Sequence, residues 1–578
     1  MQLTTGYDLG EIPFNEHPNP QLQREKWTNL NGKWDLKKLS SNGETLFNGT
    51  ILVPFSPETI NSGIEKGFVL ESGQTLVYNR FFELKKEDLE GQVIIHFGAV
   101  DSECEVYIND NLVGCHLGGF TPFEFEIASF LVGGENRLTV KVKDEAIEKG
   151  WARGKQSKKR GGIWYTPQSG IWQTVWLEFL PLYPITNLKI TPIFNENKVN
   201  LTFNSKSKVK AIVLDNGKEI LALDGEEKIE LAYNFEPWTP ENPKLYDLVL
   251  ENQSGDKINS YFGFRSFEIV KDKTGKKRLG LNGKPYFYNG VLDQGYWSDG
   301  MLTYPSDKAI IDELTMLKDM GFNTVRKHIK LEPMRWYYHC DRLGLAVWQD
   351  FVNGGGDYNF FRIALFPQMG FNRHRDNDYK FFARESEDAK KEYYQMMDEI
   401  VKTLYNCVSV GVYVPFNEGW GQFDSGKVTR QLEKLDPTRI IDSVSGWHDQ
   451  GKDQTRIKSM HIYFTPLRVP KDERAVVLSE FGGYSYKVKG HVFDEEKTFG
   501  YRQYKTQEKY IKAVEKLFTK KIIKMIKKGL SASIYTQVSD VEEEINGLVT
   551  YDRKVQKIPT EKMREINDKL KEVWKVIE

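Results

Sequence analysis

The sequence predicts a multidomain protein with an N-terminal jelly-roll β-sandwich, an immunoglobulin-like β-sandwich and a C-terminal (β/α)8 TIM barrel. Three observations support this. The chain has 578 residues, which is too long for one hydrophobic core and implies two to four domains. Short alternating apolar runs between turn signals fill the first half. Strand-like and helix-like segments alternate through the second half.

Residues 1–180 are predicted to form the jelly roll. Alternating runs such as Gln92–Phe97 and Arg137–Val142 are separated by turn signals such as Gly133-Gly134. The basic stretch Arg153–Arg160 is interpreted as a solvated loop rather than as a binding element.

Residues 181–272 are predicted to form the immunoglobulin-like sandwich. Runs such as Val199–Phe203 and Tyr246–Leu250 have the length and spacing of strands in that fold. We find no chemistry-bearing motif here and interpret this domain as a spacer.

Residues 273–578 are predicted to form the barrel. Helices are expected over Asp307–Met320 and Asp388–Leu404, and no helix is evident between strands five and six. The long segment 354–386 is interpreted as a lid or wall of the site. The eight expected strands are Tyr286–Val291, Thr324–His328, Ala346–Asp350, Val408–Phe416, Ile440–Val444, Met460–Tyr463, Val476–Glu480 and Ser531–Gln537.

Composition narrows the classes of partner. The net charge of −1 argues against a nucleic-acid partner held by bulk electrostatics. The absence of an apolar run of about 18 residues or more argues against a membrane partner. The four cysteines have no metal-ligand spacing, and the N-terminus lacks the pattern of a signal peptide, so a cytoplasmic protein with reduced thiols is expected. Homo-oligomer formation is left open.

Two carboxylates stand at strand ends. The strand Val408–Phe416 stops at Asn417-Glu418 and a glycine-rich turn, and the strand Val476–Glu480 is followed by Gly482-Gly483. One such acid is as easily a polar cap as a functional group. Two acids on the rim where a (β/α)8 barrel carries its chemistry are what glycoside hydrolysis requires.

Longer motifs carry a resemblance to a known family. Arg160–Trp176 is similar to the N-terminal signature of glycoside hydrolase family 2, and Gly321–His328 and Cys340–Asp350 resemble its barrel signatures. The family contains β-galactosidases, β-glucuronidases and β-mannosidases. The resemblance covers nearly the whole chain and implies that the first domain binds sugar.

The resemblance also implies roles for residues. Glu418 would be the acid/base and Glu480 the nucleophile of a retaining reaction. Asn417 would hydrogen-bond the sugar 2-hydroxyl, and Tyr463 would orient the nucleophile. We expect burial and the charge of Glu480 to raise the pKa of Glu418.

Further candidates follow from position at the strand ends. Arg326 is expected to brace carboxylates below the sugar. No cofactor or metal is expected, because the histidines are scattered and Gly354–Gly356 lacks the features of a phosphate loop. The candidate subsite contacts are Asp293, His328, Asp350, Trp447 and Tyr535.

The predicted function is that of a retaining exo-β-glycosidase acting on an oligosaccharide or glycoside, with β-galactosidase as the first choice. β-Glucuronidase, β-mannosidase and a non-catalytic carbohydrate-binding protein are the alternatives. Family β-glucuronidases carry an Asn-x-Lys pair after the last strand, where Glu544 and Asn546 stand here by similarity. That substitution favours a neutral sugar. Other loops offer cations that would reverse this preference: Lys330, Arg362, Arg373 and Arg375.

Overall fold

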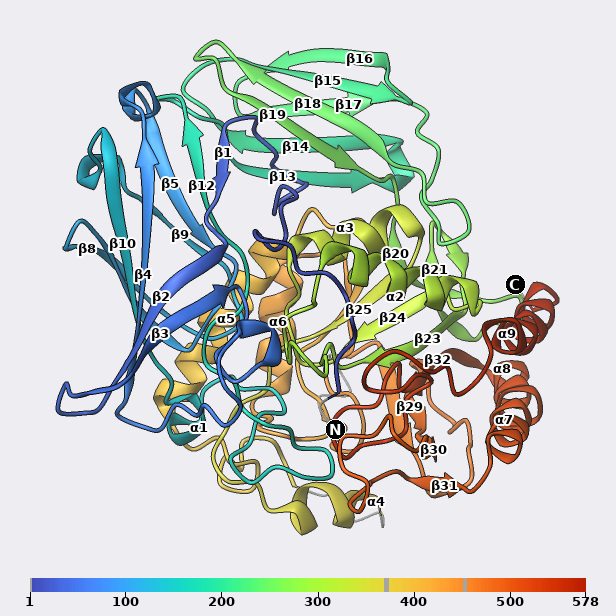
Figure 1. The fold of residues 1–578 in the computed structure, drawn as a ribbon. Helices are drawn as coiled ribbons and strands as arrows, with labels where there is room; N and C mark the ends of the chain where they lie inside the picture. Colours follow the sequence, from blue (N-terminus) through green and yellow to red (C-terminus); the bar gives the residue numbers. More distant parts are fainter. Residues whose placement is uncertain (1–2, 369–373, 451–454, 578) are drawn as a thin grey trace.

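The computed structural model describes residues 3–368, 374–450 and 455–577. Figure 1 shows two β-sandwiches, coloured blue and green, packed around a barrel that runs from green to red. The predicted fold class is confirmed. Strand β2 (Gly32–Leu39) illustrates the local cause, since its residues alternate between buried and exposed as in a sheet with one face on a core.

The N-terminal region consists of two antiparallel sheets with a shared core. Their strand orders are β3-β2-β4-β10-β7-β8 and β1-β12-β5-β9, with a small β11-β6 pair. Trp34, Phe97 and Val140 are buried between the sheets. The other strands and the α-helix of this region are β1 (Trp27–Asn29), β3 (Thr45–Val53), β4 (Thr75–Leu84), β5 (Gln92–Phe97), β6 (Val100–Asp101), β7 (Glu103–Ile108), β8 (Asn111–Leu117), β9 (Phe123–Glu126), β10 (Gly134–Lys143), α1 (Ala146–Lys149), β11 (Gly170–Ile171) and β12 (Val175–Leu180).

The second region is a smaller sandwich of two antiparallel sheets. Their orders are β13-β14-β17 and β16-β15-β18-β19, and a three-stranded sheet, β20-β21-β22, leads into the barrel. The bounds are β13 (Thr186–Ile193), β14 (Lys198–Asn204), β15 (Val209–Asp215), β16 (Lys218–Gly225), β17 (Lys228–Ala232), β18 (Tyr246–Asn252), β19 (Lys257–Phe262), β20 (Phe267–Lys271), β21 (Lys277–Leu281) and β22 (Lys284–Pro285).

The barrel contains the eight expected parallel strands, in the order β27-β26-β25-β24-β23-β32-β29-β28. Within the described ranges no ladder joins β27 to β28, so the barrel is nearly closed. Between these two strands, where no helix was evident in the sequence, the described residues contain none. The fifth strand is shorter than predicted, and the other ends shift by a few residues. The bounds are β23 (Tyr288–Asp293), β24 (Thr324–Lys327), β25 (Ala346–Asp350), β26 (Val410–Val414), β27 (Ile440–Ile441), β28 (Ile457–Ile462), β29 (Ala475–Gly482) and β32 (Leu530–Thr536).

Helices cover the outside of the barrel. The two predicted helices are α2 (Asp307–Asp319) and α5 (Glu387–Leu404), and each begins after a serine whose side chain accepts a backbone N–H of the first turn. The remaining barrel elements are α3 (Met334–Leu343), η5 (Phe361–Leu365), α4 (Phe366–Gln368), α6 (Ser425–Leu435), β30 (Tyr484–Tyr486), β31 (Arg502–Tyr504), α7 (Gln507–Lys516), η6 (Leu517–Ile522), α8 (Ile523–Lys528) and α9 (Thr560–Lys575).

A loop of the N-terminal region reaches the mouth of the barrel. The backbone N–H groups of Arg153 and Gly154 both donate to the carbonyl of Asn353, at 3.1 and 3.0 Å. Gly154 has φ +60°, and a Cβ there would lie 3.1 Å from the carbonyl oxygen of Ile329, just beyond β24. The start of the basic stretch is therefore packed against the barrel, and its interpretation as a solvated loop was wrong for these residues.

No described helix is long and apolar enough to cross a membrane. The four cysteines are free thiols.

Candidate active site

The turn after β26 has an unusual backbone conformation. Glu418 has φ 53°, in the left-handed region that a residue with a side chain seldom adopts. Its N–H donates to the carbonyl of Ser445 at 2.8 Å, which fixes the turn against the next strand end. Gly421 cannot be replaced without rearrangement, because an added Cβ would lie 1.8 Å from the carbonyl oxygen of Gly354. The turn therefore holds the Glu418 carboxylate in one place.

A β-bulge positions the second carboxylate. On the β28 side, the pairing skips Ser479, because Leu478 and Glu480 pair with consecutive residues of β28. On the β32 side, the pairing advances by three residues from Leu478 to Phe481, while β32 advances by only two. One extra residue in β29 breaks the usual alternation, so Ser479 and Glu480 both make polar contacts within the barrel.

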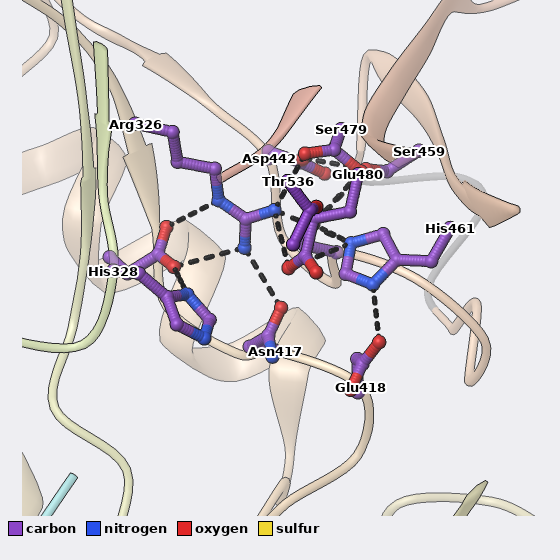
Figure 2. A network of polar contacts seen from close by, with 12 residues as sticks. Arg326, His328, Asn417, Glu418, Asp442, Ser459, His461, Ser479, Glu480 and Thr536 are labelled. Carbon is purple, nitrogen blue, oxygen red and sulfur yellow. Dashed lines mark hydrogen bonds and ion pairs between the residues drawn. The ribbon is translucent and has the colours of Figure 1, made fainter. Parts of the chain in front are cut away.

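The two carboxylates converge on one histidine, as Figure 2 shows. His461 Nδ1 lies 2.7 Å from Glu418 Oε1, and His461 Nε2 lies 3.6 Å from Glu480 Oε1. An oxygen of Glu418, an oxygen of Glu480 and a ring nitrogen of His461 all lie within 4.8 Å of one another. The side chains are buried, so strand-end placement has brought the predicted pair together.

Arg326 connects the floor of this site. It lies at 0% exposure and makes a double hydrogen bond to Asp350 at 2.9 and 3.0 Å. It also donates to Glu480 Oε1 at 3.1 Å and to Asn417 Oδ1 at 2.8 Å. Figure 2 shows Arg326 between Glu480 and Asn417. A buried cation in this position offsets the cost of placing several carboxylates together.

Glu480 is held from its other side by a tyrosine hydroxyl. The Tyr463 hydroxyl donates to Glu480 Oε2 and lies 3.1 Å from Thr536 Oγ1. The Tyr463 ring stacks on that of Tyr501, with centroids 3.9 Å apart. Both oxygens of Glu480 therefore have fixed donors, which orients the carboxylate.

Glu418 has different surroundings. Trp420 Nε1 donates to Glu418 Oε2 at 3.2 Å. Burial raises the pKa of Glu418, but the hydrogen bond and charge of His461, the charge of Lys155 and the Trp420 hydrogen bond together lower it below its usual range. This direction is opposite to the sequence-based expectation, which did not include His461 or Lys155.

The remaining predicted residues divide into two groups. His328 lies in the network, with Nδ1 2.6 Å from Asp350 Oδ2, and burial lowers its pKa well below the usual value. Trp447 packs edge-on to the His461 ring, with centroids 6.2 Å apart. Asp293 instead pairs with Lys327, and Tyr535 packs in the core against Phe481 and Phe518. The structure does not bring those last two to the carboxylates.

Sequence reasoning missed several residues of the site. His461 was counted only among the scattered histidines, and Thr536 lay only within the predicted last strand. Beneath His461, the Ser445 hydroxyl lies 2.8 Å from Nε2 and donates to Ser479 Oγ at 3.0 Å. Ser459 and His461, two residues apart on β28, and the adjacent Ser479 and Glu480 on β29 were the available sequence signal for this layer.

Among the residues that the structure describes, Glu418, His461 and Glu480 have ligand atoms close enough together to hold a metal ion. Hydrogen bonds within the protein already account for their positions. We therefore assign no metal here.

The aromatic wall beside Glu418 comes from two parts of the chain. The ring of Trp164 stacks on that of Tyr358 with centroids 5.6 Å apart, and both rings contact Trp420 edge-on at 5.2 and 5.0 Å. Tyr358, in the described part of the segment 354–386, thus packs against Trp420 in the turn that carries Glu418.

Comparison with known proteins identifies the class as that of the glycoside hydrolases. Models of three domains match the chain: "Glycosyl hydrolases family 2, sugar binding domain" over residues 55–181, "Glycosyl hydrolases family 2" over 186–265, and "Glycosyl hydrolases family 2, TIM barrel domain" over 273–573. The last match alone spans more than half of the chain. The chain belongs to glycosyl hydrolase family 2, as its motifs indicated.

Individual relatives share parts of the chain or its fold. A β-galactosidase of Streptococcus thermophilus is 29% identical over 302 residues, which is 48% of this chain but only 28% of that enzyme. A β-glucuronidase from an uncultured Clostridium species superposes with a TM-score of 0.74 at 16% identity, covering 96% of this chain and 99% of that one. A β-galacturonidase from Eisenbergiella tayi gives 0.70 at 17%, covering 97% and 99%. At these identities the two structures establish a shared fold.

Proposed function

We propose that the protein is a retaining exo-β-glycosidase in which Glu480 is the nucleophile and Glu418 the acid/base. The observation that carries the proposal is the approach of one oxygen of each carboxylate to within 4.8 Å. Retaining enzymes place their carboxyl groups about 5–5.5 Å apart, whereas inverting enzymes leave about 6.5–9.5 Å for a water molecule. The short separation favours direct attack by a carboxylate.

The two glutamates are suited to different steps. Glu480 is oriented by Arg326 and Tyr463, which favours attack on the anomeric carbon with formation of a covalent glycosyl-enzyme. Glu418 would give its proton to the leaving oxygen and then remove a proton from the attacking water. Asn417, fixed by Arg326, would bind the sugar 2-hydroxyl, and His328 and Trp447 would line the sugar pocket.

Stereochemistry provides the direct test. Hydrolysis of a nitrophenyl β-glycoside is expected to release the β-anomer first, because two inversions at the anomeric carbon give net retention. Proton NMR of the first product, recorded before mutarotation, distinguishes the outcomes. Release of the α-anomer would contradict the proposed mechanism, and absence of hydrolysis across a panel of aryl β-glycosides would favour the non-catalytic carbohydrate-binding alternative.

The pH dependence tests the role of His461. Glu418 must be protonated for the first step, so kcat/KM should fall as pH rises through its pKa. His461 lowers that pKa in the folded enzyme. His461→Gln removes the ring that lowers the pKa of Glu418 and should move the alkaline limb of the kcat/KM profile to higher pH. If the alkaline limb were unchanged in a folded variant, the ionisation of Glu418 would not be what sets that limb.

Two sugar classes have support in this site. A β-galactoside is the sequence-based prediction, and the buried Glu544 and Asn546 support it because carboxylate and amide oxygens suit sugar hydroxyls. A β-uronide is the second candidate. It is favoured by one observation that the sequence analysis lacked, namely a lysine of the N-terminal region whose charge acts on the site.

A further inference from the structure

Lys155 comes from the N-terminal region but is placed by the barrel. It follows Gly154, which approaches Ile329 beyond β24, and its own carbonyl accepts the N–H of Tyr165 at 2.9 Å. Its ammonium lies over the Tyr165 ring, 5.8 Å from the centroid. Both sides of this short loop are therefore anchored, and Lys155 is half-buried at the mouth of the barrel.

The charge of Lys155 acts on groups from several strand ends. Burial raises the pKa of Asp350 on β25 and of Glu544 beyond β32, and the charge of Lys155 opposes both rises. The same charge adds to the effect of His461 in lowering the pKa of Glu418 after β26. It also adds to the effect of burial in lowering the pKa of His328. The contacts agree with this placement, because the ammonium lies over the Tyr165 ring and the Tyr165 hydroxyl donates to Glu544, beyond β32.

Other cations near this rim are already paired. Arg326 is bonded to Asp350 and Glu480, and Arg160 lies 2.6 Å from Glu543. Arg153 donates to the carbonyl groups of Gly355 and Gly356. Within the described part of the chain, the Lys155 ammonium makes no ion pair or hydrogen bond, and its one recorded partner is the Tyr165 ring.

The cations considered from the sequence do not fill this role. Lys330 is buried away from the carboxylates, where it bonds two backbone carbonyls and Glu332. Arg362 and Arg375 are exposed to solvent. Arg373 lies outside the described residues.

Glu544 does not prevent an anion from binding near Lys155. Its two oxygens accept hydrogen bonds from Tyr165 and from Asn546, the latter at 2.9 Å. Burial raises the pKa of Glu544 above its usual value, while Lys155 opposes that rise. A carboxylate whose oxygens are already satisfied has less need of sugar hydroxyls than the sequence suggested.

We propose that Lys155 is a specificity-determining residue that binds the C6 carboxylate of a β-linked uronic acid at the mouth of the barrel. This rests on the proposed glycosidase function. An ammonium that is partly withdrawn from water and lacks an anionic partner is best satisfied by a carboxylate, and a buried uronate needs such a cation. The N-terminal region would thereby decide which sugar the barrel accepts.

The test uses substrates that differ only at C6. Nitrophenyl β-galacturonide is compared with the β-galactoside, and the β-glucuronide with the β-glucoside, so that the two pairs also distinguish the two uronic acids. We expect the wild-type enzyme to prefer the uronide in at least one pair, as judged by kcat/KM.

Substitutions then assign the preference to Lys155. Lys155→Met should lower the uronide-to-neutral ratio of kcat/KM by about 30-fold or more, which is the range for loss of one partner of a buried charge pair. Lys155→Arg should keep more of the ratio. Lys159→Met is the matched control, because Lys159 is exposed on the same loop, and it should leave the ratio unchanged.

Competition provides a measurement that needs no variant. Free galacturonate or glucuronate should inhibit the wild-type enzyme at lower concentration than galactose or glucose. Preference for the neutral member in both pairs, or an equal loss on both members in Lys155→Met, would overturn the assignment. If neutral glycosides are hydrolysed with retention in that case, the proposed glycosidase function stands and only the role of Lys155 fails.

Discussion

Glu480→Ala is expected to lower kcat by several orders of magnitude on every substrate, because the covalent route disappears with the nucleophile. Two features of the structure make this the most damaging change. Both oxygens of Glu480 are oriented by Arg326 and Tyr463, and no other carboxylate occupies the bulge. Steady-state kinetics on a dinitrophenyl glycoside would measure this loss, because that leaving group needs little protonation by Glu418.

Azide can distinguish loss of the nucleophile from loss of the fold. In Glu480→Ala, the space left by the side chain should admit azide, which would attack the anomeric carbon directly and give an α-glycosyl azide. Glu473→Ala is the matched control, because Glu473 is exposed just before β29 and should leave kcat unchanged. Near-normal activity in Glu480→Ala would end the assignment.

The carboxylate pair could be predicted because its cause is local. A parallel strand followed by a glycine-rich turn places its last side chain on the carboxyl rim of the sheet. Glu418 and Glu480 both follow this pattern, so their convergence follows from topology without knowledge of any distant contact. Asn417 is near them for the same reason, whereas Arg326 reaches them from within β24.

Other positions depend on registers that the sequence does not display. Thr536, at the end of β32, contacts Tyr463, so alternation along the strand directs the neighbouring Tyr535 outward into the helix layer. The sequence does not show this register, so the prediction from strand-end position wrongly placed Tyr535 on the rim. The bulge in β29 similarly shifts Glu480 relative to β28, which places His461 opposite it.

Contacts between distant regions were the hardest to predict. Lys155 lies in a stretch that reads as a charged surface loop, and only the packing of Gly154 against the barrel brings it to the site. His461 contributes most to lowering the pKa of the buried Glu418, and the same contact adds the charge of Lys155 to that lowering. A local pattern does not contain a charge supplied from about 260 residues away in the chain.

Glu418→Ala is expected to discriminate between leaving groups. Substrates with poor leaving groups need the proton of Glu418, so their kcat/KM should fall by about 10²–10⁴-fold. Dinitrophenyl glycosides need little protonation and should react nearly normally in the first step. A covalent glycosyl-enzyme should then accumulate, because the base for the second step is also missing, and a burst of dinitrophenol would report it.

The product formed with azide completes the argument for Glu418. Azide would attack the accumulated glycosyl-enzyme on Glu480 and give a β-glycosyl azide, the opposite anomer from that expected in Glu480→Ala. Glu433→Ala, exposed on α6, is the control for general effects of removing a carboxylate. An equal loss on good and poor leaving groups, with no burst and no β-azide, would show that Glu418 does not transfer the proton. The two azide products together would assign each glutamate to its own face of the sugar.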